Sequence, residues 1–336
     1  MNLIRAELER LGARRFVQLM VVLLVLAFGV TAATTLASSH TPTAVELAEA
    51  QRQVASDRRA MELEHDRCLA RDRGDVPRTA DDFSYLPDDC SQLDPALREY
   101  QPVTADYLSG VFTFTRQAMP LLYFLVAFLM LFGFLVGASY IGADLNSGGV
   151  VNLLLWRPRR LTVLGAKLGT LLGAVLGLSL LASAAYLVTF WVIAQIAGYP
   201  GPTNAAFWAS LGAVWGRGLV LVLLVTAGGF AIATIGRHTS AALGAVAAYL
   251  VLWELGGRIV LQILEVARHD QLMLVSYIGA WLAGEMSFWD NTPCPPYGSC
   301  TGNYTLTWGP ALTVLLLLTS GLTAAAFAMF RRRDLT

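Results

Sequence analysis

The residues of this chain best suited to contact another molecule lie between residues 137 and 168. Three arginines and the only lysine of the chain cluster there, and residues 146–149 (Asn-Ser-Gly-Gly) interrupt the helical pattern. The basic residues are Arg157, Arg159, Arg160 and Lys167. Two long apolar runs flank this segment. A polar stretch with concentrated positive charge at such a place predicts a loop that docks on a partner through charge and shape.

No residues with catalytic spacing accompany this loop. HExxH, GxSxG and histidines paired on one helix face are all absent from the sequence. A Walker A loop requires Gly-Lys-Ser/Thr, and the only lysine follows Ala166. We therefore expect no catalytic, cofactor-binding or metal-binding residues on this chain. Any ATP that its function requires is hydrolysed on another chain.

Arg217, Glu254 and Arg258 are charged residues that fall inside apolar runs. Charge within a membrane is costly and is treated as functional by default. At a rise of ~1.5 Å per residue, Arg217 and Glu254 come to similar depths, and Arg258 follows Glu254 by one turn. We predict a Glu254–Arg217 or Glu254–Arg258 pair that lines a cavity. The alternative is a structural pair that fixes two helices.

The elements that must position these residues follow from the composition. The chain is 55% hydrophobic and 14% charged, whereas a soluble domain carries about 25% charged residues. Ile4, Leu8 and Leu11 form an apolar stripe, which predicts a short amphipathic helix in the membrane interface over residues 1–15. Six apolar runs are long enough to cross a membrane: residues 16–37, 118–141, 163–197, 207–235, 239–262 and 308–330. The predicted fold class is an all-α polytopic membrane protein.

The distribution of arginine predicts the orientation of these spans. The flanks of one side hold the arginines of residues 1–15, the basic cluster of residues 142–162, Arg237 and residues 331–333. The loop at residues 198–206 on the other side holds none. By the positive-inside rule, both termini are expected in the cytoplasm. The 23 arginines against one lysine indicate a GC-rich bacterial genome, and the expected location is the bacterial cell membrane.

The segment before the last span is the ambiguous one. Residues 271–289 are apolar but short, and Glu285 interrupts them. A seventh span here would place the tail, residues 331–336, on the side opposite the N-terminal arginines. We therefore expect residues 263–307 to form a re-entrant or interfacial helical pair on the outer side.

Residues 38–117 are expected to form an extracellular domain. Residues 38–115 hold fifteen of the 24 acidic residues against eight arginines, which argues against a nucleic-acid partner. All four cysteines fall in segments assigned to the outside, as expected for disulfides. Of the three possible pairings, we favour the local ones, and a metal site with His65 near the first cysteine is the alternative. The pairs are Cys68–Cys90 and Cys294–Cys300.

Glycines spaced by four open the third span. Small residues at this spacing allow close approach of helices. We expect packing against a neighbouring span of the same chain, with a dimer seam as the second possibility. The glycines are Gly165, Gly169, Gly173 and Gly177.

The stretch GADLNSGGVVNLLLWRPRRLTVLGAKL resembles the loop between the second and third spans of type-2 ABC exporter permeases. The family's positions are occupied in order by an acidic residue, a glycine four positions on, a leucine run, a proline, an arginine and a lysine. The sequence departs from the family pattern at two positions: Asp144 stands where Glu is usual, and Gly149 stands where Thr is usual. The ending FRRRDLT resembles the family's basic tail. The resemblance covers nearly the whole chain except residues 38–115. The matching residues are Asp144, Gly148, Leu153, Leu154, Leu155, Pro158, Arg160 and Lys167.

This resemblance implies a permease subunit, paired with a second copy or a related permease, on two cytoplasmic ABC ATPases that hold ATP and magnesium. Leu153, Leu154, Leu155 and Trp156 would be apolar anchors in a groove of the ATPase, with Gly148 and Gly149 permitting a sharp entry. The arginines could instead bind anionic membrane lipid. The implied substrate of the exporter is lipophilic or amphipathic: a lipid, a drug or a peptide antibiotic. The alternative function is a membrane sensor or tether that uses its extracellular domain without transport.

Overall fold

The structure is a computed structural model that describes residues 3–75, 86–87, 89–98, 101–147, 160–290 and 302–332. The chain divides into two compact units. The first comprises Met1–Gly29, Pro120–Tyr186 and Trp208–Thr336, and the second comprises Val30–Met119 and Leu187–Phe207.

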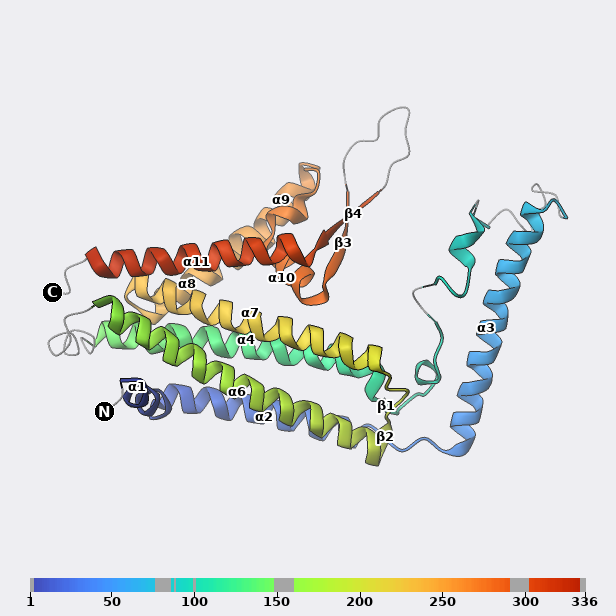
Figure 1. Ribbon diagram of the computed structural model, residues 1–336, viewed down its shortest axis with the longest axis horizontal. Coiled ribbons are helices and arrows are strands. Elements are labelled where there is room, and N and C mark those ends of the chain that lie inside the picture. The colour runs from blue at the N-terminus through green and yellow to red at the C-terminus, as the bar shows by residue number, and fades with distance from the viewer. Residues whose placement is uncertain are drawn as a thin grey trace. The chain divides into compact units, whose positions relative to one another are not determined.

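Six helices among the described residues are long and apolar enough to cross a membrane. This agrees with the six predicted spans. They are α2 (Arg15–Ala37), α4 (Phe114–Asn146), α6 (Arg160–Ala197), α7 (Ala205–Gly236), a continuous helix over Thr239–Ile263, and α11 (Trp308–Arg332). Apolar helices suit a membrane because every backbone polar group is satisfied within the helix. The structure is therefore that of a predominantly helical, multi-pass membrane protein (Figure 1).

The fifth of these helices changes its winding in the middle. It begins as α8 (Thr239–Ala248), continues as the π-helical segment η4 (Tyr249–Gly257), and ends as α9 (Arg258–Ile263). A π-helix adds one residue per turn and reorients the side chains that follow it. Glu254 lies inside this segment, so α-helical spacing does not predict where its side chain points.

Helices α4 and α7 form the centre of the first unit. In each of them, 56% of the residues in the most apolar stretch are buried. In each of the other spans, this share is 28% or less. Their backbones approach closely at glycines: a Cβ on Gly137 would lie 2.6 Å from the carbonyl oxygen of Thr226, and one on Gly229 2.7 Å from that of Phe134. Small residues thus allow the two helices to pack without an intervening side chain.

The glycine stripe of α6 does not serve the packing that its spacing predicted. A Cβ on Gly169, Gly173 or Gly177 would meet no atom within 4 Å, and one on Gly165 only Phe327 at 3.9 Å. Within the described part of the chain, this face of α6 is therefore not packed closely against another helix. The close approach occurs instead on α4 and α7.

Residues before the last span form one short helix and a hairpin. The turn η5 (His269–Leu272) leads into α10 (Leu274–Ala283), and β3 (Glu285–Trp289) pairs antiparallel with β4 (Asn303–Thr307). Where a helical pair was expected, the described residues thus contain one ten-residue helix followed by strands. Their core joins α10 and β4 to α7 and α11 through Leu221, Ala280, Trp281, Leu306, Ala311 and Leu315.

The second unit contains the long helix α3 (Ala44–Asp72), the short turns η2 (Cys90–Leu93) and η3 (Thr104–Asp106), and a parallel pairing of β1 (Phe112–Thr113) with β2 (Gly198–Tyr199). Thr43 and Glu46 form a capping box at the start of α3. The predicted Cys68–Cys90 disulfide is present, with Leu86 and Leu93 packed around it. It leaves neither cysteine free as a metal ligand. Cys294 and Cys300 lie outside the described residues.

Candidate functional site

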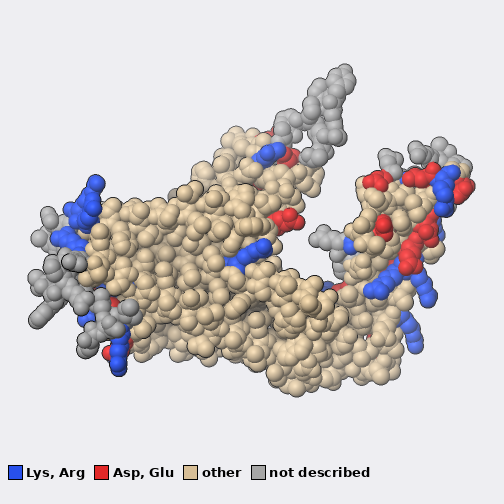
Figure 2. Space-filling model, in the orientation of Figure 1, with Lys and Arg blue, Asp and Glu red and all other residues tan. Residues whose placement is uncertain are grey.

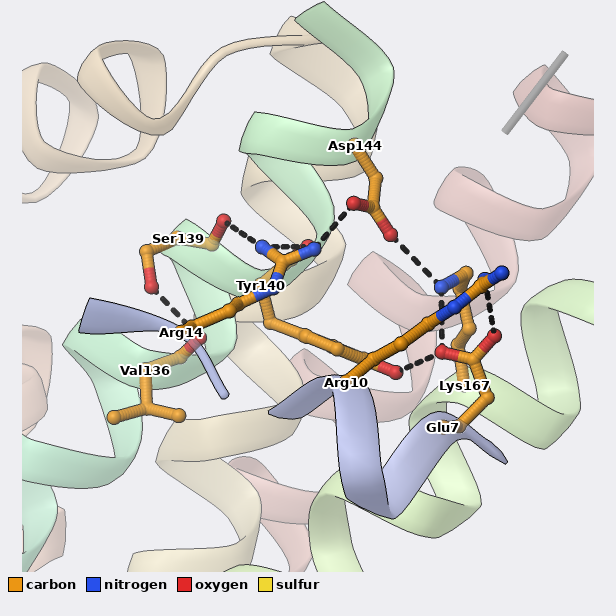
Figure 3. A network of polar contacts seen from close by, with 8 residues as sticks. All are labelled: Glu7, Arg10, Arg14, Val136, Ser139, Tyr140, Asp144 and Lys167. Atoms are coloured by element: carbon orange, nitrogen blue, oxygen red, sulfur yellow. Dashed lines mark hydrogen bonds and ion pairs between the residues drawn. The ribbon is translucent and has the colours of Figure 1, made fainter. Parts of the chain in front are cut away.

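Charged residues from three helices meet in one buried cluster (Figure 3). Lys167 on α6 exposes 2% of its side chain, and Glu7 on α1 (Leu3–Gly12) exposes 1%. Lys167 Nζ donates to Glu7 Oε2 at 2.7 Å and to Asp144 Oδ2 on α4 at 2.8 Å. A single ammonium group therefore bridges two carboxylates that belong to two other helices. We refer to Glu7, Arg14, Tyr140, Asp144 and Lys167 as the ion cluster.

Tyr140 lies one turn before Asp144 and contacts both cations of the cluster. Its hydroxyl donates a hydrogen bond to Glu7 Oε2, and its side chain is fully buried. The ring centre lies 4.9 Å from Lys167 Nζ and 4.8 Å from Arg14 Cζ. Both distances are within the range of cation–π attraction. Tyr140 thus contacts the carboxylate of Glu7 through its hydroxyl and both cations through its ring.

Arg14 connects the turn between α1 and α2 to the end of α4. Its guanidinium pairs with Asp144 and donates to the carbonyl oxygens of Tyr140 at 2.9 Å and Ser139 at 3.3 Å. Arg10 adds a more exposed contact to Glu7 at 3.3 Å. Each carboxylate of the cluster is therefore bonded to two basic side chains.

This pairing explains how the charges are tolerated in the interior. Burying an isolated ion costs several kcal/mol even after relaxation, and removal of one partner from a buried pair costs about 3–5 kcal/mol. In the cluster every buried charge has an opposite charge within hydrogen-bond distance. The arrangement fixes α1, α4 and α6 to one another, since separating any of them would leave a charge unpaired.

The ion cluster brings together the two ends of the predicted docking loop. Asp144 lies just before residues 148–159 and Lys167 just after them, and their side chains meet inside the protein. Because Lys167 is almost fully buried, it is not available to contact a docked partner. Arg160 begins α6 and is half-buried. The other predicted loop residues, Gly148, Gly149, Leu153, Leu154, Leu155, Trp156 and Pro158, lie outside the described residues.

Glu7 is a site residue that the sequence analysis missed. The stripe of Leu8 and Leu11 led to the prediction of an apolar face on α1, and Glu7 precedes Leu11 by one turn on that same face. An acidic residue on the apolar face of an amphipathic helix was the signal that could have identified it. In the structure Glu7 and Leu11 are both buried, whereas Leu8 is exposed.

The predicted ion pair of Glu254 with Arg217 or Arg258 is not formed among the described residues. Glu254 Oε1 instead accepts from the hydroxyl of Tyr249 and the backbone N–H of Val275, both at 2.9 Å. Arg258 pairs with Asp270 at 3.4 Å. The π-helical winding of η4 directs Glu254 to the first turn of α10, where free backbone N–H groups and the helix dipole stabilise a carboxylate.

Glu254 also lines a cavity of about 390 Å³. Side chains of α4, α7, α8, η4, α10 and α11 surround this space, and Glu254 is the only charged residue among those that line it. The remaining surface is almost entirely aliphatic or aromatic. The described residues contain no group of three or more His, Cys, Asp or Glu side chains that could hold a metal ion.

Comparison with known protein families identifies a match over almost the whole chain. A family model described as "ABC-2 family transporter protein" matches residues 1–335. No curated protein and no solved structure matches the chain.

Proposed function

Because this chain belongs to the ABC-2 family of transporter proteins, we propose that it is the membrane-spanning permease subunit of an ATP-driven exporter. Membership in the family implies a partnership with an ABC ATPase. The chain would supply the route through the membrane, and the ATPase would supply ATP, magnesium and hydrolysis.

The ion cluster is the observation that carries this proposal. It links α1 to the ends of the two helices that flank residues 147–159. A force applied to that loop by an ATPase would reach α4 and α6 directly, and α1 through Glu7. The ionic bonds keep the three helices together, so they would move as one body. On this proposal Asp144 and Lys167 transmit motion, and residues 148–160 make the contact with the ATPase.

The proposed orientation places this end of the helices in the cytoplasm. Arg5, Arg10, Arg14 and Arg15 lie here, as do Arg160, Arg237, Arg331 and Arg332 at the ends of α6, α7 and α11. On the face shown in Figure 2, basic side chains gather at this end, and few charged side chains lie on the apolar helices that are long enough to cross a membrane. Such an asymmetry is typical of a cytoplasmic side.

We propose a lipophilic or amphipathic substrate, since the described residues offer an apolar cavity and little polar lining for a sugar or an ion. The functional unit would contain two permeases, identical or related, and two ATPases. Residues 38–117 would face the exterior, where the Cys68–Cys90 disulfide is stable.

The test is co-purification with a candidate ABC ATPase, followed by ATP turnover in lipid. Wild type should retain the ATPase. Gly148→Arg, which adds a long side chain to the predicted docking turn, should lose it. Tyr140→Phe, inside the ion cluster, should retain the ATPase but couple it poorly to substrate. If wild type binds no ABC ATPase, the exporter proposal fails and a sensor or tether function becomes the better explanation.

A further inference from the structure

We propose that the cavity between α4, α7, η4, α10 and α11 binds a cationic amphiphile. An alkyl chain would occupy the apolar part of the cavity, and a protonated amine would bind the carboxylate of Glu254. The inference rests on the proposed function only for the claim that this ligand is exported. The binding itself is argued from the cavity.

The size and lining of the cavity suit one alkyl chain. Its volume of about 390 Å³ lies within the range of roughly 300–1,000 Å³ typical of small-molecule sites. The walls include Met130, Phe134, Leu224, Ile278 and Leu322, which provide no hydrogen-bonding side-chain groups apart from the weakly accepting sulfur of Met130. An apolar chain bound here would be removed from polar groups and water along its length.

Glu254 provides a single charged anchor in this apolar space. The side chain is 7% exposed, and both of its hydrogen bonds end on Oε1. No described residue donates to Oε2. One carboxylate oxygen therefore remains available to a donor that enters the cavity.

The contacts of Glu254 position its carboxylate. Two donors converge on Oε1, and one of them is a backbone N–H in the first turn of α10. An N–H group at a helix N-terminus stabilises negative charge. Tyr249 is held in place as well, because its hydroxyl accepts from the backbone N–H of Leu274 at 3.2 Å. The anchor is thus positioned before any ligand binds.

A carboxylate group can select among ligands by the charge of their head group. A protonated amine would form a charge-assisted hydrogen bond with Oε2, which is roughly twice as strong as a neutral one. An alcohol could form only the weaker bond, and an anionic head group would be repelled. The π-helical segment that carries Glu254 is consistent with a binding role, since π-helical turns occur frequently at functional sites.

The experiment compares three probes of equal chain length: dodecylamine, dodecanol and dodecanoate. Equilibrium binding of each radiolabelled probe is measured on the full chain in phosphatidylcholine nanodiscs, with empty nanodiscs as background. We expect wild type to bind the amine roughly tenfold or more tightly than the alcohol, and to bind the carboxylate most weakly. Glu254→Gln retains an acceptor for Val275 and Tyr249 and should lose the preference for the amine.

Two variants separate charge recognition from cavity shape and from folding. Gly228→Leu fills the cavity at a position where an added Cβ meets no atom within 4 Å, so it should weaken amine and alcohol alike without disturbing the contacts of Glu254. Glu285→Gln neutralises an exposed carboxylate on β3 that does not line the cavity, and it should leave all three affinities unchanged.

Three results would overturn the inference: equal affinities of wild type for amine and alcohol, an amine affinity unchanged in Glu254→Gln, or an amine affinity unchanged in Gly228→Leu. A different result would contradict the exporter proposal while leaving the binding inference intact. In that case the amine binds with the expected dependence on Glu254, but it does not change ATP turnover by any bound ATPase.

Discussion

Glu7 and Lys167 are 160 positions apart in the sequence, yet Lys167 Nζ lies 2.7 Å from Glu7 Oε2. The two side chains expose only 1% and 2% of their surface. The short helix α1 is therefore not merely adjacent to α6. An ionic bond from which water is excluded fixes it there, and α1 is expected to follow any movement of α6.

We predict that Lys167→Met destabilises the protein by about 3–5 kcal/mol, because two buried carboxylates lose their shared cation. Combining it with Glu7→Gln should restore part of this loss, since fewer unpaired charges remain. Thermal unfolding of the single and double variants in nanodiscs measures the coupling between the two positions. Additive losses in the double variant would contradict the buried pairing.

The matched control is the pair formed by Arg5 and Glu9 on α1. These side chains are 80% and 63% exposed and lie 3.1 Å apart. Solvent-exposed pairs of this kind contribute about 0–1 kcal/mol. Arg5→Met should therefore leave unfolding nearly unchanged, although it also removes one positive charge.

Tyr140→Phe removes the hydroxyl that donates to Glu7 but retains the ring that contacts Arg14 and Lys167. We expect a loss of about 1–3 kcal/mol, the usual cost of leaving one buried partner unsatisfied. Tyr123→Phe, at a half-exposed position on the same helix, should cost little. Unfolding temperatures of the two variants decide between a hydroxyl that stabilises the cluster and one that is incidental.

The positions of the spans could be predicted from the sequence because length and apolarity alone determine them. The ion cluster could be predicted only in part. Lys167 stood out as the only lysine, and Asp144 was named through the resemblance to the family's loop. Glu7 is distant in sequence and was assigned to a helix considered only for its apolar face. The predicted ion pair of Glu254 with Arg258 was wrong, because a π-helical segment changes which face of the helix a residue occupies. Thirteen residues, 290–302, separate the paired strands β3 and β4 in the sequence, and no local pattern indicated that pairing.

The proposed orientation predicts which cysteines a membrane-impermeant maleimide can reach. In intact cells, a cysteine introduced at the exposed Ser56 of α3 should react, whereas Cys68 and Cys90 should not, because they form a buried disulfide. A cysteine introduced at the exposed Ser147 should react only after the membrane is permeabilised. The background for both measurements is Cys294→Ser/Cys300→Ser. Labelling of Ser147→Cys in intact cells would show that the orientation is the opposite of the one proposed.

The start of α3 is predicted to weaken in acid. Backbone and side-chain hydrogen bonds from Thr43, with a further bond from His40, hold the pKa of Glu46 below its ordinary value. A lowered folded-state pKa means that the stabilisation is present above the unfolded pKa of about 4.3 and is lost as the pH falls through the folded-state pKa. Hydrogen exchange of the amides at residues 44–47, corrected for intrinsic rates, should show this acid-induced opening in wild type. In Glu46→Gln the opening should be nearly independent of pH.

Two glycines on different helices should respond in opposite ways to the same added methyl group. Gly137→Ala on α4 would place a Cβ 2.6 Å from the carbonyl oxygen of Thr226, and a backbone atom cannot rotate away. We expect a loss of about 1–3 kcal/mol from this overpacking. Gly173→Ala on α6 meets no atom within 4 Å and should gain roughly 0.5–1 kcal/mol from helix propensity. Thermal unfolding in nanodiscs gives the sign at each position. A loss at Gly173 as large as that at Gly137 would mean that another molecule packs against α6, and the oligomeric state of Gly173→Leu would then show whether that molecule is a second copy of this chain.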